Sequence, residues 1–152
     1  MIKTLGKSEL KILQDQLRKA YNVDIMTKKD IVQMNMDNKF VMVNKELWFF
    51  NVEDKIVPTL KLLIKNNFLK KITVDMGAVK HVVSGADIMR PGIVSIDEGI
   101  NAEDFVVIID VNNKRPLAVG IALFNSREIE AYKTGRVIKN IHYVGDEIWG
   151  AQ

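Results

Sequence analysis

Residues 74–93, with the sequence VDMGAVKHVVSGADIMRPGI, determine the fold predicted for the second half of the chain. Gly77 and Gly85 bracket a segment of about two helical turns, and glycine at either end permits a sharp change of chain direction. The valines between these glycines recur at helical spacing, so we expect them to face a core. The stretch therefore predicts a short helix with one buried face, closed by a glycine turn.

The opposite face of this short helix carries polar side chains. Lys80, His81 and Ser84 fall there and are expected to face solvent. Arg90 precedes Pro91, which biases Arg90 toward an extended backbone at the mouth of the glycine turn. Lys80, Arg90 and nearby backbone amides could bind phosphate, while His81 could stack or hydrogen-bond on a base.

The rest of the second half reads as short strands separated by glycine turns, with a second short helix. The expected strands are 72–75, 90–94, 105–110, 116–122, 137–138 and 141–144, and Ser126 is expected to cap a helix over 126–132. This pattern predicts a small mixed β-barrel with short helices, closed at one end by Trp149, and with Met76 and Met89 packed inside.

The first half has a different pattern and is predicted to be a small α+β domain. Apolar residues at helical spacing predict a helix over 8–21 with Ser8 as N-cap, and Pro58 is expected in the first turn of a second helix. Between them, a β-hairpin (31–36 and 39–44) and a strand (47–52) are expected. We place the domains at 1–72 and 73–152, an α+β fold class overall.

The charge is divided unequally between these halves. The 152 residues carry a net charge of +3, but residues 1–72 hold 14 Lys and Arg against 8 Asp and Glu, whereas residues 73–152 hold 8 against 11. The first half is therefore +6 and the second −3. A basic half favours a polyanionic partner.

Several classes of function find no support in the residues. The absence of cysteine excludes disulfides and thiolate zinc sites. Gly6-Lys7-Ser8 lacks the earlier glycine and strand of a phosphate-binding loop, and His81 and His142 have no metal-ligand spacing. We therefore expect no catalytic residues, no metal and no cofactor. Without an apolar run long enough to span a bilayer or an N-terminal signal pattern, a soluble cytoplasmic protein without membrane contact is expected.

Residues 74–93 resemble the signature of a PUA domain, an RNA-binding module named after pseudouridine synthases and archaeosine transglycosylases. The later stretches 116–120, 135–137 and 141–149 match as well, so the resemblance covers residues 73–149. Asn140-Ile141-His142-Tyr143 with Asp146 and Trp149 is similar to the malignant-T-cell-amplified-sequence proteins and the ligatin-type translation factors. Those proteins place a pre-PUA α+β domain directly before the PUA domain.

The resemblance implies a non-catalytic RNA-binding protein of translation initiation or recycling. The implied ligand is tRNA, near its acceptor end, or small-subunit rRNA, with the ribosome or a density-regulated-protein-like factor as possible partners. The candidate RNA-contacting residues are Gly77, Ala78, Lys80, His81, Ser84, Gly85, Ala86, Arg90, Pro91 and Gly92. The glycines and Pro91 are also required by the fold itself, whether or not RNA binds.

Other interpretations stay open at this point. Lys61, Lys65, Lys70 and Lys71 could form a basic strip that leads toward the PUA motif, or could belong to solvated surfaces. The chain could instead be an accessory or targeting subunit of an enzyme that modifies tRNA or rRNA. A third hypothesis is a protein–protein adaptor without RNA binding that uses Trp48-Phe49-Phe50, although this triplet is more typical of a core.

Overall fold

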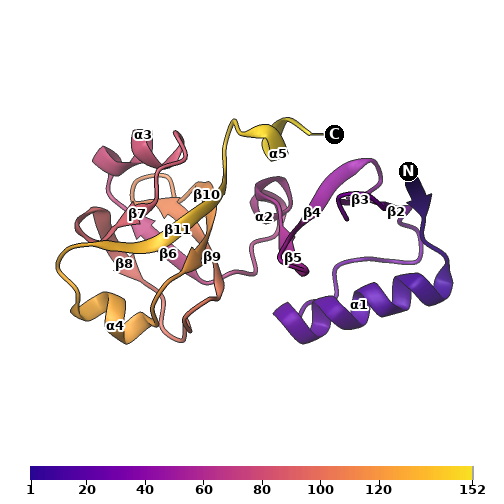
Figure 1. Cartoon of the computed structure of the whole chain (residues 1–152), viewed down its shortest axis with the longest axis horizontal. Coiled ribbons are helices and arrows are strands. Elements are labelled where there is room, and N and C mark those ends of the chain that lie inside the picture. The colour runs from indigo at the N-terminus through magenta and orange to yellow at the C-terminus, as the bar shows by residue number, and fades with distance from the viewer. Residues whose placement is uncertain (152) are drawn as a thin grey trace.

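The structure, a computed structural model, describes residues 1–151 and contains two β-sheets, one in each half of the chain (Figure 1). In the first half, five strands pair antiparallel in sequence order. They are β1 (Ile2–Thr4), β2 (Val32–Asn35), β3 (Val41–Val43), β4 (Glu46–Val52) and β5 (Lys55–Pro58). The predicted hairpin is confirmed as β2 and β3, and the predicted third strand as β4.

Helix α1 (Lys7–Tyr21) confirms the first predicted helix. Leu13 and Leu17 are buried in a cluster with residues of the first sheet, because apolar side chains recur on one face of the helix. The predicted N-cap is wrong, since Ser8 lies within the helix and Gly6 is the N-cap. The side chain of Glu9 reaches back and accepts the backbone N–H of Gly6 at 3.1 Å, which satisfies this N–H at the start of the helix.

Helix α2 (Leu60–Lys65) follows β5 directly. Pro58 was expected inside this helix but is the last residue of β5, a position that a residue without an N–H also suits. Thr59 is the N-cap: its Oγ1 accepts the backbone N–H of Leu62 at 3.4 Å and donates to the carbonyl of Leu47 at 2.8 Å. The buried threonine thus joins the start of α2 to strand β4.

The second half is a nearly closed barrel of six strands in the order β7-β11-β10-β9-β6-β8 (Figure 1). The strands are β6 (Lys71–Val74), β7 (Ile88–Met89), β8 (Ile93–Ile96), β9 (Phe105–Asp110), β10 (Pro116–Ala122) and β11 (Arg136–Tyr143). The β6–β9 pair is parallel and the others are antiparallel. The short helices are α3 (Val79–Val82), α4 (Ser126–Ala131) and α5 (Glu147–Gly150). The predicted mixed barrel is confirmed.

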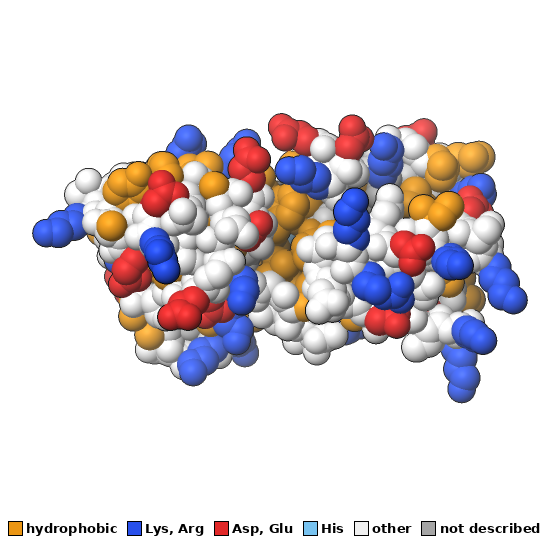
Figure 2. All heavy atoms as spheres, turned by 90° about the horizontal axis from the view of Figure 1, so that it is seen from below, with side chains coloured by type: hydrophobic (Ala, Val, Ile, Leu, Met, Phe, Trp, Pro, Cys, Tyr) orange, Lys and Arg blue, Asp and Glu red, His pale blue; other side chains and the backbone are white. Residues whose placement is uncertain are grey.

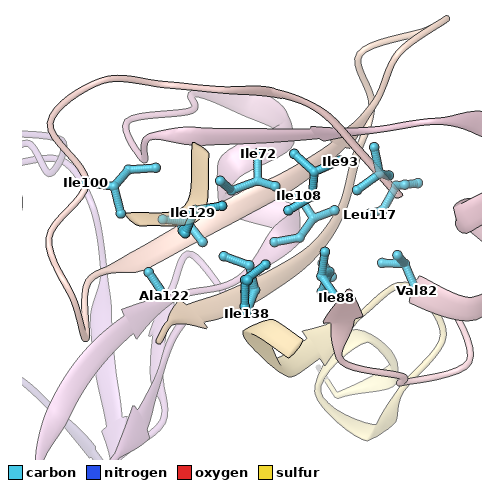
Figure 3. Close-up of a cluster of buried hydrophobic side chains, with 14 residues drawn as sticks. Ile72, Val82, Ile88, Ile93, Ile100, Ile108, Leu117, Ala122, Ile129 and Ile138 are labelled. Atoms are coloured by element: carbon cyan, nitrogen blue, oxygen red, sulfur yellow. The ribbon is translucent and has the colours of Figure 1, made fainter. Parts of the chain in front are cut away.

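Aliphatic side chains fill this barrel. Figure 3 shows Ile72 of β6, Ile108 of β9 and Ile138 of β11 pointing toward one another, with Val82 of α3 at the edge of the cluster. These side chains are all buried. The burial of Val82 confirms that the apolar face of α3 packs into the core, as its spacing predicted.

Some details of the second half differ from expectation. Residues Arg90–Gly92 form a turn of 3-10 helix ahead of β8, and the two final strands are one strand, β11. The N-cap of α4 is Asn125 rather than Ser126. Met76 and Met89, which were expected to pack inside, are 42% and 50% exposed. Within residues 1–151, no helix has the length and apolar character needed to cross a membrane.

A further buried cluster joins the two halves of the chain. Phe50 and Leu63 of the first half pack in it with Val107 of the barrel, while the alternate residues of β9 face the barrel interior. Both faces of β9 are therefore buried, which explains its uninterrupted apolar sequence. Trp149, expected to close the barrel, packs against this cluster instead, and the Lys61 ammonium lies 5.3 Å from its ring centroid.

His142 forms a polar link across this interface. Its side chain is buried, and Nε2 accepts the backbone N–H of Leu60, the first residue of α2, at 3.1 Å. Nδ1 lies 3.0 Å from both carboxylate oxygens of Asp146. An accepting Nε2 places the proton on Nδ1, which donates to Asp146. Burial lowers the pKa of His142, while Asp146 opposes this shift. The neutral imidazole thus caps a helix of the other half.

Candidate nucleic-acid interface

The first part of the candidate surface is a turn of 3-10 helix (Met76–Ala78) that precedes α3. The side chain of Asp75 caps this turn by accepting the N–H of Ala78 at 2.9 Å, and the N–H of Asp75 donates to the carbonyl of Gly92 at 2.9 Å. A Cβ at Gly92 would lie 3.2 Å from the Cβ of Ala78. The structure thus brings the predicted residues Gly77 and Ala78 together with Gly92. A small residue at position 92 permits this close approach.

The second part is α3 and the loop after it. Lys80, His81 and Ser84 are exposed, in agreement with the face predicted for them, and Ala86 is exposed beside them. The hydroxyl of Ser84 donates to the carbonyl of Lys80 at 2.6 Å and so closes the last turn of the helix. An ammonium group and an imidazole thus project from one short rigid turn, a combination that suits phosphate and base contacts.

Gly85 fixes the path of this loop. Its φ is +91°, and a Cβ there would lie 2.8 Å from the ring of Tyr143. Glycine is therefore required both by the backbone conformation and by the aromatic ring packed against it. Tyr143 is half-buried and lies next to the predicted surface. The sequence did not indicate Tyr143 as a site residue.

Residues of strand β11 make hydrogen bonds to α3 and to the loop that follows it. The Asn140 Nδ2 donates to the carbonyls of Val82 and Ala86, each at 3.0 Å. The Asp87 carboxylate accepts the backbone N–H of Asn140 at 2.9 Å and pairs with Arg136 at 3.0 Å. The sequence did not predict this role of Asn140. The feature of the sequence that could have indicated this role is an asparagine within a predicted strand region, because asparagine is depleted in strands.

Arg90, which was predicted to bind phosphate, makes hydrogen bonds within the protein. Its Nε donates to the carbonyl of Ile129 at 2.7 Å, and its Nη1 donates to the carbonyl of Ile93 at 3.2 Å. Its backbone N–H donates to the carbonyl of Gly135 at 2.8 Å. Arg90 thus ties its turn to α4, and these two bonds leave the other guanidinium N–H groups without a partner among residues 1–151. The neighbouring Pro91 is exposed.

The four lysines of the predicted basic strip are in different environments. Lys65 pairs with Glu46 at 2.6 Å, and the hydrogen bond from Lys65 lowers the pKa of Glu46. Lys61 is half-buried and lies over an aromatic ring, as described above. Lys70 and Lys71 are exposed and have no carboxylate partner within residues 1–151. A phosphate-binding role therefore suits the last two better than the first two.

The aromatic triplet of the adaptor hypothesis is mostly unavailable to a partner. Phe49 and Phe50 are buried in the core, as the sequence predicted. Trp48 is half-buried, and its Nε1 donates to Glu46 at 3.1 Å. Across residues 1–151, no group of three His, Asp or Glu side chains is placed to hold a metal ion.

Two family models match the chain, the PUA domain over residues 70–144 and a domain of unknown function, DUF1947, over residues 4–66. The chain is 45% identical to an uncharacterised protein of Methanocaldococcus jannaschii, over 95% of this chain and 93% of that protein. It is 37% identical to malignant T-cell-amplified sequence 1-B of Xenopus laevis, over 95% and 88%. It is 28% identical to translation machinery-associated protein 20 of Schizosaccharomyces pombe, over 94% and 83%.

Solved structures are similar as well. The crystal structure of a hypothetical protein from Pyrococcus horikoshii matches with a TM-score of 0.83 and 33% identity, over 99% of this chain and 98% of that chain. A chain in the structure of an H/ACA RNP bound to a substrate RNA containing 2′-deoxyuridine matches with a TM-score of 0.52 and 27% identity, over 63% and 29%. With the fold and these relatives in agreement, the chain belongs to the malignant-T-cell-amplified-sequence family of proteins, in which a pre-PUA domain precedes a PUA domain.

Proposed function

We propose that this chain is a non-catalytic RNA-binding protein of translation initiation or recycling. The observation that supports this most is the exposed turn of Lys80, His81 and Ser84, which Gly85 and Asn140 hold rigidly on a PUA barrel. A preformed surface of this kind binds without a large ordering cost. The names of the translation-associated relatives point to the same process. The ligand we propose is tRNA near its acceptor end or small-subunit rRNA, bound in the cytoplasm.

The charge distribution supports a local contact rather than a broad basic face. The barrel half carries −3, so a phosphate approaching it must be held by particular groups. Lys80 is exposed and makes no ion pair within residues 1–151, so its ammonium is available. The basic first half supplies attraction at longer range.

Replacing Lys80 by glutamate should weaken the binding of a tRNA transcript about tenfold, because one phosphate contact is lost and a like charge replaces it. The measurement is filter binding at physiological salt. Lys133→Glu is the matched control: this lysine is exposed, has no carboxylate partner in the described residues, and follows α4, which lies on the opposite edge of the barrel from α3 (Figure 1). Equal affinities of the two variants would contradict the proposed surface.

One observation favours a second candidate, an accessory subunit of an RNA-modifying enzyme. A chain of similar fold occurs in an H/ACA RNP bound to substrate RNA, although this chain spans 29% of it. Purification of the protein from native lysate separates the two candidates. Co-purification with small ribosomal subunits or tRNA supports a role in translation, whereas co-purification with a modifying enzyme supports the second.

A further inference from the structure

A groove of about 1070 Å³ lies on the side of α1, lined mainly by residues of the first half and, from the barrel, by residues 103–105. Figure 2, which views the molecule from below, shows hydrophobic side chains in this hollow and Lys or Arg side chains on both sides of it. We propose that the groove binds a single-stranded segment of RNA, as a second contact for the RNA held by the α3 surface. The inference rests on the proposed function and adds a surface to it.

Three half-buried aromatic rings contribute to the groove, each from a different segment. Tyr21 ends α1, Phe68 precedes β6, and Phe105 begins β9. The rings of Tyr21 and Phe68 lie 5.3 Å apart between centroids, and the hydroxyl of Tyr21 donates to the carbonyl of Ile56. These contacts hold Tyr21 and Phe68 in place, so the groove presents fixed ring surfaces on which bases can stack.

Lysines from separate elements surround these rings. Lys19 of α1, Lys55 of β5 and Lys70 ahead of β6 all line the groove and are exposed. Within residues 1–151, none of the three has a carboxylate oxygen within 4.0 Å. Ammonium groups without internal partners are available for phosphate.

The groove also contains acidic residues, but most of them are engaged within the protein. Asp54 pairs with a fourth lysine, Lys39, at 3.2 Å. Asp104 accepts the backbone N–H of Asn101 at 2.8 Å in a turn. Only Glu103 makes no side-chain bond or ion pair among the described residues. Four lysines therefore line the groove against three carboxylates, a net charge of +1, and Lys19, Lys55 and Lys70 are the lysines without a carboxylate partner.

This combination favours RNA over a peptide. Single-stranded nucleic acids are bound by basic grooves in which aromatic side chains stack on successive bases. An apolar peptide would cover the rings but leave three ammonium groups without partners. The groove also gives a specific role to part of the +6 charge of residues 1–72, to which Lys19, Lys55 and Lys70 all belong.

The test is the binding of a twelve-nucleotide oligouridine to the full chain at several salt concentrations. The triple variant Lys19→Glu/Lys55→Glu/Lys70→Glu should bind about 30-fold more weakly. The slope of log affinity against log salt concentration should become shallower by about two, because each lost phosphate contact with a single strand removes about 0.7. A second triple variant with glutamine at these positions should show a smaller loss, which separates charge reversal from contact loss. Thermal melting of both variants confirms that they fold.

The matched control is Lys11→Glu/Lys28→Glu/Lys29→Glu, which has the same charge change at exposed lysines outside the groove. Equal weakening by both glutamate triples would overturn the groove and leave only long-range attraction. A loss with Lys80→Glu but not with the groove variant would also overturn it while the proposed function stands. A loss with the groove variant alone would retain the groove and reject the α3 surface, and a wild-type protein that binds no RNA would reject both.

Discussion

Replacing His142 by alanine should lower the free energy of unfolding by about 4 kcal/mol. The substitution leaves the buried N–H of Leu60 without an acceptor, removes the imidazole partner of the Asp146 carboxylate, and opens a cavity beside Phe50, whose ring centroid lies 5.4 Å from that of the imidazole. A buried unpaired donor costs about 1–3 kcal/mol, and cavity formation adds a comparable amount. Urea denaturation followed by tryptophan fluorescence measures the change.

The second histidine is the natural control. His81 is exposed, so His81→Ala should change stability by less than about 0.5 kcal/mol. His142→Gln, which retains an acceptor for Leu60, should recover part of the loss. If His142→Ala and His81→Ala are equally stable, the hydrogen bonds of His142 do not contribute to the fold.

The pH dependence of stability gives an independent readout for the same residue. Burial lowers the pKa of His142 below its ordinary value of 6.5, so the unfolded chain binds a proton more readily than the folded one. The stabilisation from the neutral imidazole is therefore complete above pH 6.5 and decreases as the pH falls through the lowered pKa. His142→Gln should lack this component of the acid sensitivity.

Replacing Gly120 by alanine should cost about 3 kcal/mol. A Cβ at this position of β10 would lie 2.4 Å from Cγ2 of Ile138 and 2.9 Å from the carbonyl oxygen of Lys139. Both contacts are with β11, the strand paired with β10, and Ile138 is fully buried in the barrel core, so neither atom can move without shifting the sheet. Overpacking of this kind costs about 1–3 kcal/mol or more. The midpoint of urea denaturation checks the value.

Gly150→Ala is the matched control for this substitution. A Cβ at Gly150 meets no atom of the described residues within 4 Å, and its backbone does not require glycine. Alanine favours helix there, so stability should stay the same or rise slightly. Equal stability of Gly120→Ala and the wild type would show that β10 and β11 are less closely packed than described.

Local patterns predicted those elements whose residues are buried regularly. The strands at 105–110 and 116–122 have the bounds predicted for them, because uninterrupted apolar runs mark strands that are covered on both faces. Strand β1 gave no such signal, since all three of its residues are exposed. Strand β5 follows a turn at Glu53 and Asp54, both of which have positive φ. Because the turn contains no glycine, the sequence did not indicate it or the strand after it.

The candidate site was predictable in composition but not in its internal bonds. Helical spacing and Gly85 identified the exposed turn of Lys80 and His81. The role of Asn140 depends on strand register, and that of His142 depends on a partner 82 residues away in the sequence. Arg90 was predicted as a phosphate contact, and the hydrogen bonds of its guanidinium to two carbonyl groups were not foreseen. Contacts of this type come from tertiary packing, which local spacing does not encode.

RNA binding by the exposed turn of α3 can be tested by crosslinking the full chain to cellular RNA, followed by mass spectrometry of the protein and sequencing of the RNA. We expect crosslinked peptides within residues 76–92, with adducts on Lys80 or His81, and an enrichment of tRNA acceptor ends or small-subunit rRNA. RNA crosslinked efficiently to the chain but never within residues 76–92 would contradict it.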